Sequence, residues 1–280
     1  MQQITQKLNA KLDDVSIVAN DRIQLKAWSI HPRNGNGNAV LLLHGLGDNR
    51  AGMTGYAELF LRHGYDVLMP DARAHGESEG TAETYGFLER NDIRSWFEWL
   101  TFTQHPHCIY GLGESMGAAQ LLQALQTEPD FCAAIAESSF STFREISYDR
   151  VGQFFGAGPW LGRTVLRPVL ELAFLYARRK YKINFAEVSP QAAVAATQIP
   201  VFLIHGLIDG NIPERHSRRI LAANKNVVLW EVPNADHCGA IHTAPQEFES
   251  KVISWTENYS SHQETFSSVS NQSLNQHNQY

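Results

Sequence analysis

Three residues far apart in the chain have the types and the order that nucleophilic catalysis needs. Ser115 lies in a Gly-Glu-Ser-Met-Gly pentapeptide at 113–117, and Asp209 and His237 follow it in that order. A serine hydroxyl is a weak nucleophile at neutral pH, so it needs a general base, and that base needs an acid to orient it. We therefore predict that Ser115 is the nucleophile, His237 the base and Asp209 the acid of an acyl-transfer site.

Two other carboxylates compete with Asp209 for the role of the acid. Asp236 is adjacent to His237, but neighbouring residues in a loop point apart. Glu137 follows the end of a predicted strand and is the stronger rival. Asp209 is preferred because it follows the strand that precedes the one leading to His237, and because the order Ser, Asp, His is the one expected for this chemistry.

Further histidines and cysteines do not suggest a metal site. His44 and His205 each precede a glycine in a predicted turn, where we expect bonds to the backbone rather than reactivity. The runs at 105–108 (His-Pro-His-Cys) and 237–238 (His-Cys) could suggest metal ligands. However, neither has a carboxylate or a second pair at useful spacing, so we predict no metal and no cofactor.

An acyl-transfer site also needs two N–H donors about 3 Å from the developing oxyanion. The backbone N–H of Met116, directly after the nucleophile, is the first expected donor. The second should come from the loop that follows the first parallel strand. Leu46 is our choice there, with Gly47 as the second option.

The pentapeptide lies where a strand should turn sharply into a helix. Residues 108–110 are of strand type, and apolar residues at 118, 121, 122 and 125 repeat as on one face of a helix. Glycines at 113 and 117 let strand and helix approach closely, and the helix N-terminus suits a developing negative charge. The pentapeptide alone arises by chance in roughly one chain in ten of this length, so the surrounding elements must support it.

Buried strands alternate with helices from residue 39 to 259, which predicts an α/β fold with a mostly parallel central sheet and helices on both faces. Ligands bind at the carboxyl ends of such strands. Leu46, Arg73, Ser115, Asp209 and His237 should therefore converge. The strands are expected at 15–18, 23–30, 39–43, 65–69, 108–110, 131–136, 200–204 and 227–232, and helices at 87–102 and about 245–259.

One segment interrupts the alternation. Residues 137–198 contain no buried strand, but 140–155 and 159–181 look helical, which indicates a helical lid insertion. Its aromatic residues either pack the lid's own core or form an apolar acyl or aryl pocket, with 178–180 (Arg-Arg-Lys) favouring an anionic head group or membrane surface. These aromatic residues are Phe154, Phe155, Trp160, Phe174 and Tyr176.

The predicted domain organisation follows from these patterns. It comprises an N-terminal segment at 1–13, a core at 14–139 and 197–259, the lid at 140–196, and a polar tail at 260–280. The tail is rich in Ser, Gln, Asn and His and has little to bury, so we expect it to be disordered.

Composition excludes several classes of protein. The 280 residues are 43% hydrophobic and 19% charged, as in a large soluble domain. The net charge of −6, without a dense basic block, argues against nucleic-acid binding. No apolar run is long enough for a transmembrane segment, and no signal-peptide core is seen. The three cysteines do not suggest a disulfide framework, so we expect a reducing, cytoplasmic compartment; an anchor outside this chain and the oligomeric state stay open.

Several motifs together resemble the α/β-hydrolase superfamily, and within it the serine-aminopeptidase-like and feruloyl (cinnamoyl) esterase-like hydrolases. The resemblance covers about 14–258 and implies the α/β-hydrolase fold, the triad of Ser115, Asp209 and His237, and an oxyanion N–H from Leu46. Ala74 departs from the pattern, since the family often has glycine there. The matching motifs are 44–49 (HGLGDN), 71–78 (DARAHGES), 113–117 (GESMG), 205–209 (HGLID) with 212–213 (IP), and 236–237 (DH).

The leading hypothesis is a serine hydrolase that cleaves carboxylic esters of a small-molecule acyl substrate through an acyl-enzyme. The same triad would serve a peptidase or amidase, a thioesterase, a lipase or a perhydrolase, and the fold does not choose among them. A dehalogenase is disfavoured because it needs a carboxylate where Ser115 stands. A non-catalytic binding protein of this fold is a different class, but such proteins usually lack a member of the triad.

Overall fold

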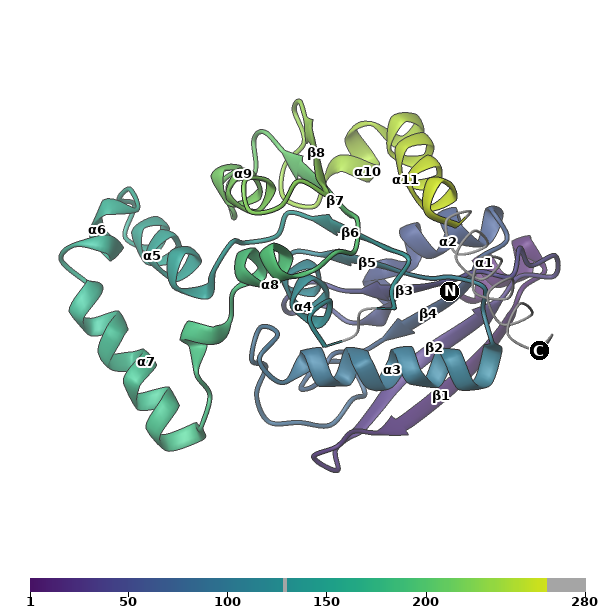
Figure 1. The fold of residues 1–280 in the computed structure, drawn as a ribbon, viewed down its shortest axis with the longest axis horizontal. Helices are drawn as coiled ribbons and strands as arrows, with labels where there is room; N and C mark the ends of the chain where they lie inside the picture. Colours follow the sequence, from purple (N-terminus) through teal and green to yellow (C-terminus); the bar gives the residue numbers. More distant parts are fainter. Residues whose placement is uncertain (128–129, 261–280) are drawn as a thin grey trace, which may run out of the picture.

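An eight-stranded sheet forms the middle layer of the molecule (Figure 1). The computed structural model describes residues 1–127 and 130–260, and its strands follow the order β1-β2-β4-β3-β5-β6-β7-β8. β1 pairs antiparallel with β2, and β2 antiparallel with β4, while every neighbouring pair from β4 to β8 is parallel. The predicted α/β class and mostly parallel sheet are confirmed. The strands are β1 (Lys11–Val18), β2 (Gln24–His31), β3 (Ala39–Leu43), β4 (Asp66–Pro70), β5 (Ile109–Glu114), β6 (Ala133–Glu137), β7 (Val201–Gly206) and β8 (Val227–Val232).

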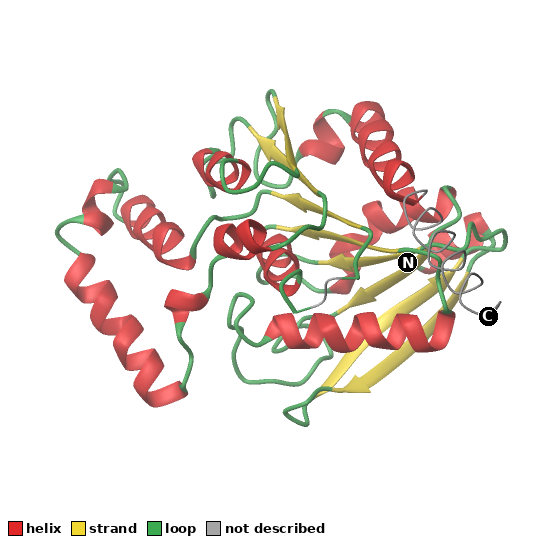
Figure 2. Ribbon diagram, viewed as in Figure 1, coloured by secondary structure: helices red, strands yellow, loops and turns green. Residues whose placement is uncertain are grey.

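Helices cover both faces of this sheet, as Figure 2 shows. α3, α4, α8 and α9 contribute to one apolar layer, and α2, α10 and α11 contribute to the other. None of the described helices is long and apolar enough to cross a membrane. The helices are α1 (Gln2–Leu8), η1 (Arg50–Met53), α2 (Thr54–Arg62), α3 (Glu89–Gln104), α4 (Met116–Ala124), α5 (Phe143–Phe154), α6 (Trp160–Arg163), α7 (Arg167–Tyr181), η2 (Phe185–Glu187), α8 (Pro190–Ala196), α9 (Arg215–Leu221), α10 (Ala240–Thr243) and α11 (Pro245–Ser260).

The central strands are apolar along their whole length because each of their faces meets a helical layer. In β3, Leu41 and Leu43 belong to the layer that contains α3 and α4. Val40 and Leu42 belong to the opposite layer, which contains α2 and α11. Successive side chains of a strand point to opposite faces, so a continuous apolar run is what a doubly covered strand requires.

The helices between β6 and β7 fall into two groups. α5, α6 and α7 stand apart from the sheet at the left of Figure 1. α8 instead buries Val194 in the same apolar layer as α3 and α4. The helical character expected for this segment is therefore present, whereas its role as a lid stays a prediction. Of the predicted tail, Ser260 ends α11, and residues 261–280 lie outside the described part of the chain.

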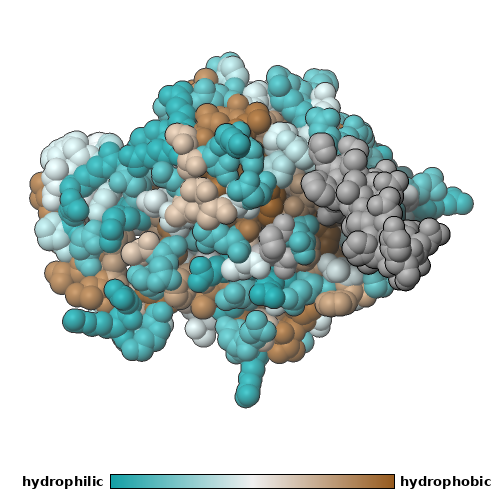
Figure 3. All heavy atoms as spheres, viewed as in Figure 1, coloured by the Kyte–Doolittle hydropathy of each residue, from teal (hydrophilic) through white to brown (hydrophobic). Residues whose placement is uncertain are grey.

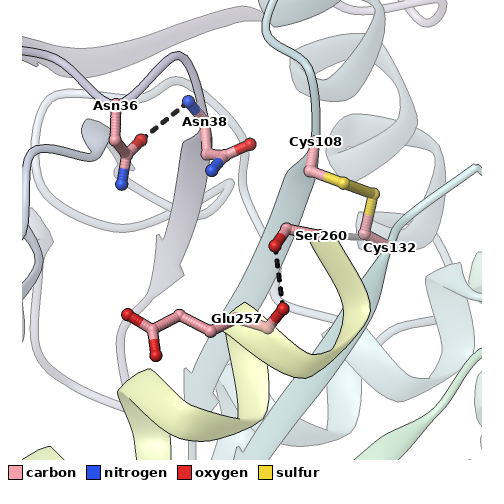
Figure 4. The surroundings of a disulfide bond; sticks show 6 residues. All are labelled: Asn36, Asn38, Cys108, Cys132, Glu257 and Ser260. Carbon is pink, nitrogen blue, oxygen red and sulfur yellow. Dashed lines mark hydrogen bonds between the residues drawn. A yellow bond between two sulfur atoms is a disulfide. The ribbon is translucent and has the colours of Figure 1, made fainter. Parts of the chain in front are cut away.

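A disulfide joins Cys108, directly before β5, to Cys132, directly before β6 (Figure 4). The two Cα atoms lie 5.8 Å apart, and Cys238 is the unpaired cysteine. The expectation of a reducing compartment therefore loses the support that it drew from the cysteine count. The cysteine count could not predict this bond, because the bond depends on Cys108 and Cys132 preceding neighbouring parallel strands at the same level of the sheet.

The loop after β4 is held by a buried ion pair rather than by contact with the predicted triad. The Arg73 guanidinium donates to both carboxylate oxygens of Asp92, each at 2.7 Å, and to Asp21 at 2.8 Å. Ala74 has a φ of 60°, in the left-handed region that glycine adopts most readily. This backbone conformation explains why glycine is common at that position in the family that the sequence resembles.

Candidate active site

Ser115 lies at the tip of a sharp turn between β5 and α4. Its φ of 51° and ψ of −111° are unusual for a residue other than glycine, and strain of this kind concentrates at functional sites. A Cβ atom added to Gly117 would lie 2.3 Å from the carbonyl oxygen of Leu43, and one added to Gly113 would lie 2.5 Å from the backbone of Gly117. Both glycines are therefore required for β3, β5 and α4 to approach so closely.

A chain of two hydrogen bonds joins the three residues of the predicted triad. Ser115 Oγ lies 2.9 Å from Nε2 of His237, and Nδ1 of His237 lies 2.8 Å from Oδ2 of Asp209. The other carboxylate oxygen of Asp209 accepts the N–H groups of Asn211 and Ile212, each at 2.8 Å. With Nδ1–H donating to the carboxylate, Nε2 of the neutral imidazole is free to accept the serine proton.

Electrostatics keep the acid of this chain ionised. The Asp209 side chain is fully buried, and the His237 side chain is 22% exposed. Burial alone would raise the pKa of Asp209. The hydrogen bond and charge of His237, together with the two backbone N–H donors, outweigh that effect and lower this pKa below its usual value. Asp209 is therefore a carboxylate at neutral pH, as an orienting acid must be.

The rival acids do not contact the base. Asp236 is exposed to solvent and makes no hydrogen bond to His237 in the described structure. Glu137 is buried, but its carboxyl group bonds to the Tyr56 hydroxyl and to the N–H of Ala240. Asp209 is thus the carboxylate that the structure brings to the imidazole.

His44 and His205 bond to the backbone, as expected, although His205 lies in β7 rather than in a turn. Nδ1 of His44 donates to the Gly45 carbonyl at 2.8 Å, and its Nε2 accepts the Ala72 N–H. Nε2 of His205 donates to the Ile212 carbonyl at 2.9 Å. Burial lowers the pKa of both imidazoles. The described residues contain no group of three or more His, Cys, Asp or Glu that could hold a metal.

Two residues that line the cavity beside the serine are the expected donors of the oxyanion N–H groups. Met116 is the first residue of α4, where N–H groups have no partner inside the helix. The N–H of Gly47 is directed at Nε2 of His75, 3.4 Å away, whereas the N–H of Leu46 has no acceptor among the described residues. Leu46, Ser115 and Met116 all line one cavity. This arrangement favours Leu46 over Gly47 as the second oxyanion donor.

A cavity of about 670 Å³ opens above Ser115 and His237. Its walls are mainly apolar, and α5 supplies part of them. Polar groups at the wall come from Asp48, Ser147, Arg150 and Asn211. The apolar wall residues include Leu46, Tyr85, Met116, Phe140, Phe143, Ile146 and Ile212.

The aromatic residues that the sequence singled out do not line this cavity. Phe154, Phe155, Trp160 and Tyr176 are exposed. Phe174 packs against the rings of Phe143 and Phe185. Of the two alternatives, the acyl pocket is therefore wrong for all five side chains, while packing within the helical segment is seen for Phe174 but not for the four exposed rings. A helical pattern identifies an aromatic residue but does not say which face of the helix the cavity meets.

Sequence reasoning also missed a buried acidic network beneath the triad. The Tyr56 hydroxyl lies 2.9 Å from a carboxyl oxygen of Glu137 and 3.2 Å from one of Glu114. One phenolic proton bonds strongly to one of them at a time, so the other contact needs a proton on a carboxyl group. Burial raises the pKa of Glu137 to about 7 and also raises that of Glu114. The signal available in sequence was a glutamate at the end of each of two buried strands.

A model of the alpha/beta hydrolase family matches residues 40–251. The chain belongs to this family. This α/β hydrolase is 28% identical over 217 residues to the uncharacterized protein YqkD of Bacillus subtilis, which covers 76% of the chain and 68% of the relative. It is 29% identical over 103 residues to the thermostable monoacylglycerol lipase of Bacillus sp. strain H-257, covering 34% of the chain and 38% of the lipase.

Among solved structures, the α/β hydrolase is similar to the Pyrococcus furiosus esterase Pf2001. The TM-score is 0.74 at 27% identity, and the match covers 91% of this chain and 95% of the esterase. The family and this neighbour together support hydrolase activity. They do not choose between the serine-aminopeptidase-like and esterase-like groups, so that part of the resemblance stays a prediction.

Proposed function

We propose that this α/β hydrolase cleaves carboxylic esters through an acyl-enzyme formed on Ser115. The observation that carries the proposal is the hydrogen-bonded chain from Ser115 through His237 to Asp209 at the wall of an apolar cavity. The names of the P. furiosus esterase and the Bacillus lipase support an ester substrate.

The geometry suggests a complete sequence of proton transfers. Ser115 Oγ attacks the ester carbonyl while Nε2 of His237 takes its proton, and the N–H groups of Leu46 and Met116 bind the oxyanion. The C–O bond to the leaving alcohol then breaks as His237 returns the proton to it. A water molecule attacks the acyl-enzyme in the same manner, with His237 again as base, and releases the acid. Asp209 stabilises the imidazolium in both halves.

The cavity wall favours an apolar acyl or aryl group. Phe143 and Ile146 of α5 and Tyr85 of the loop before α3 offer apolar surface beside the nucleophile. Because α5 supplies part of this wall, α5–α7 act as the lid of the cavity. Arg150 and Asn211, hydrogen-bonded to each other at 3.1 Å, place polar groups at its margin, where the alcohol portion of a substrate would leave.

A panel of p-nitrophenyl esters, acyl thioesters and aminoacyl arylamides tests the reaction class. Wild-type protein should prefer the esters, and Ser115→Ala should reduce kcat by roughly 10⁴- to 10⁶-fold. Ser147→Ala is the matched control, since Ser147 lines the same cavity but its hydroxyl donates to the Phe143 carbonyl. Equal ester hydrolysis by Ser115→Ala and wild type would show that the mechanism is wrong. A preference of wild type for thioesters or arylamides would show that the proposed ester substrate is wrong.

A further inference from the structure

The outer face of α7 is apolar although no other part of the described protein covers it. No residue of α7 is buried. Its inner side packs on α5 and η2, where Glu171 accepts from Arg144 and Tyr148 and the Phe174 ring meets Phe185. The outer side carries an exposed stripe at spacings of three and four residues, which places its members on one helical face. The stripe consists of Val169, Leu172 and Tyr176, with exposed fractions of 61%, 65% and 55%, and the exposed Val165 lies in the turn before the helix.

The same helix concentrates positive charge in an acidic protein. Residues 142–185 contain eight Lys and Arg and three Asp and Glu, whereas the whole chain contains 23 and 29. All three of the acidic residues in this segment already form ion pairs with arginine. Five of the cations on or next to α7 make no ion pair with any described residue. They are Arg167, Arg178, Arg179, Lys180 and Lys182.

The stripe and the cations adjoin. Lys180 continues the stripe one turn beyond Tyr176, and its ammonium group donates to the Tyr176 hydroxyl at 2.6 Å and lies over the rings of Tyr176 and Tyr181. Figure 3 shows apolar surface next to hydrophilic surface at the left of the view, where Figure 1 places α7. A tyrosine with a lysine folded over it presents an apolar body and a charged tip, which fits the boundary between head groups and acyl chains.

We propose that the outer face of α7 docks the protein on an anionic lipid surface. The helix lies in the plane of the interface, with Val169 and Leu172 among the acyl chains, and Arg179 and Lys180 at the anionic head groups. A second copy of this chain fits less well. It would bring the same unpaired cations to the contact, and the one acidic residue of α7, Glu171, is already paired with Arg144.

Sedimentation with vesicles tests this surface. Purified full-length protein is mixed with vesicles of phosphatidylcholine alone or of phosphatidylcholine with phosphatidylglycerol. Wild type should sediment with the anionic vesicles only, and less so as salt increases. The double variant Arg179→Gln/Lys180→Gln should bind about twenty-five-fold more weakly, since each cation contributes about fivefold. Val169→Ser/Leu172→Ser should also lose binding.

Matched variants elsewhere on the surface show whether binding depends on where the removed side chains lie or only on their number and type. Arg33→Gln/Lys225→Gln removes two exposed cations away from α7, and Phe102→Ser/Val228→Ser removes two exposed apolar side chains. Both controls should bind like wild type, as should Ser115→Ala, so the result is independent of the proposed ester chemistry. Circular dichroism verifies that each variant is folded.

Three outcomes would overturn the proposal. The first is no sedimentation of wild type with anionic vesicles at low salt. The second is equal weakening by the control variants, which would indicate attraction without a defined surface. The third is a fall in the solution mass of Val169→Ser/Leu172→Ser with vesicle binding retained, which would make the face an interface between copies of this chain.

Discussion

Asp209 has two tasks, one for each of its carboxylate oxygens. Oδ2 accepts from His237, and Oδ1 accepts from the N–H groups of Asn211 and Ile212, which fixes the loop that carries the aspartate. Because the side chain is fully buried, no water can replace either set of bonds. Orientation and charge stabilisation of the imidazole therefore depend on this one residue.

Replacing the Asp209 carboxylate by an amide of nearly the same size should reduce the activity strongly. Asp209→Asn keeps the shape, but its amide favours the wrong imidazole tautomer, so we expect kcat for ester hydrolysis to fall by about 10⁴-fold. Asp236→Asn is the matched control, since Asp236 is exposed and adjacent to His237, and it should keep wild-type kcat. If the control loses the activity and Asp209→Asn does not, the acid has been assigned to the wrong residue.

The buried pair of Glu137 and Glu114 makes stability depend on pH. Burial raises the pKa of Glu137 to about 7 from an ordinary value of 4.5. Between these values the folded state holds a proton that the unfolded state has released. Folding is therefore weakened as the pH rises through this window. Tyr56, Glu114 and His237 face Glu137 and, with the N–H of Ala240, set the size of the effect.

Glu137→Gln should remove this dependence, because glutamine resembles the protonated acid. From pH 4.5 to 7, its free energy of unfolding should fall less than that of wild type, by on the order of 2 kcal/mol. Urea denaturation at several pH values measures this difference. Glu247→Gln, at an exposed site on α11, should leave the wild-type slope unchanged. Parallel curves for wild type and Glu137→Gln would show that Glu137 is ionised throughout.

At the scale of elements, the strand–turn–helix at Ser115 depends on close approach of β3, β5 and α4. The backbone of Leu43 in β3 would be 2.3 Å from a side chain at Gly117. Backbone atoms cannot swing away as the end of a long side chain does. The position of Ser115 and that of the loop after β3, which carries Leu46, are thus set by the same contact.

An alanine at this contact should therefore disrupt folding. We expect Gly117→Ala to lower the free energy of unfolding by about 2 kcal/mol or more, through strain at the β3 backbone. Gly55→Ala is the matched control, since its added methyl group would meet only Ile241, 3.9 Å away, and alanine favours the helix α2. Chemical denaturation of both variants gives the comparison. If Gly117→Ala were as stable as Gly55→Ala, β3 and α4 would be able to move apart at little cost in free energy, which would contradict this prediction.

For the whole molecule, the disulfide lies at the opposite end of β5 from Ser115. Cys108 precedes the strand and Ser115 follows it, while Cys132 precedes the neighbouring strand β6. The bond closes a segment with a sequence separation of 24 residues, which includes β5 and α4. It should stabilise the fold mainly by restricting the unfolded chain, without contact with the cavity.

Removing the disulfide should thus lower the stability of the protein without lowering its activity. For Cys108→Ala/Cys132→Ala we expect about 3 kcal/mol less free energy of unfolding, with kcat on p-nitrophenyl esters retained at a temperature where the variant is folded. Unfolding of wild type with and without reductant gives a second measurement. Unchanged stability in both experiments would indicate that the bond does not form in solution.

Local patterns predicted the sheet and the convergence of Ser115, Asp209 and His237, for physical reasons. The run 39–43 matches β3 because a strand buried on both faces leaves an unbroken apolar pattern. The segment 227–232 matches β8, although β8 is an edge strand with partly exposed side chains. Ser115, Asp209 and His237 each follow a strand, and parallel strands bring such loops to one edge. This is why their convergence was foreseeable from order alone.

Contacts between side chains that are far apart in the sequence leave no local sequence pattern. The Tyr56 hydroxyl reaches across 58 residues to Glu114 and across 81 to Glu137, so no local spacing records the network. The disulfide depends on the register of β5 against β6, which cysteine counting ignores. The residues of the cavity wall depend on which face of α5 turns toward Ser115. The sequence pattern did not show this face, because α5 and α6 also carry aromatic residues that are exposed.

The most direct test of the central claim is the site of covalent labelling by a fluorophosphonate. Intact-mass and peptide mass spectrometry should find one adduct, on the peptide that contains Ser115. The adduct should be absent from Ser115→Ala, and its formation should be much slower in His237→Gln, which removes the base. Folded wild-type protein that stays unlabelled, or an adduct that persists in Ser115→Ala, would contradict the account.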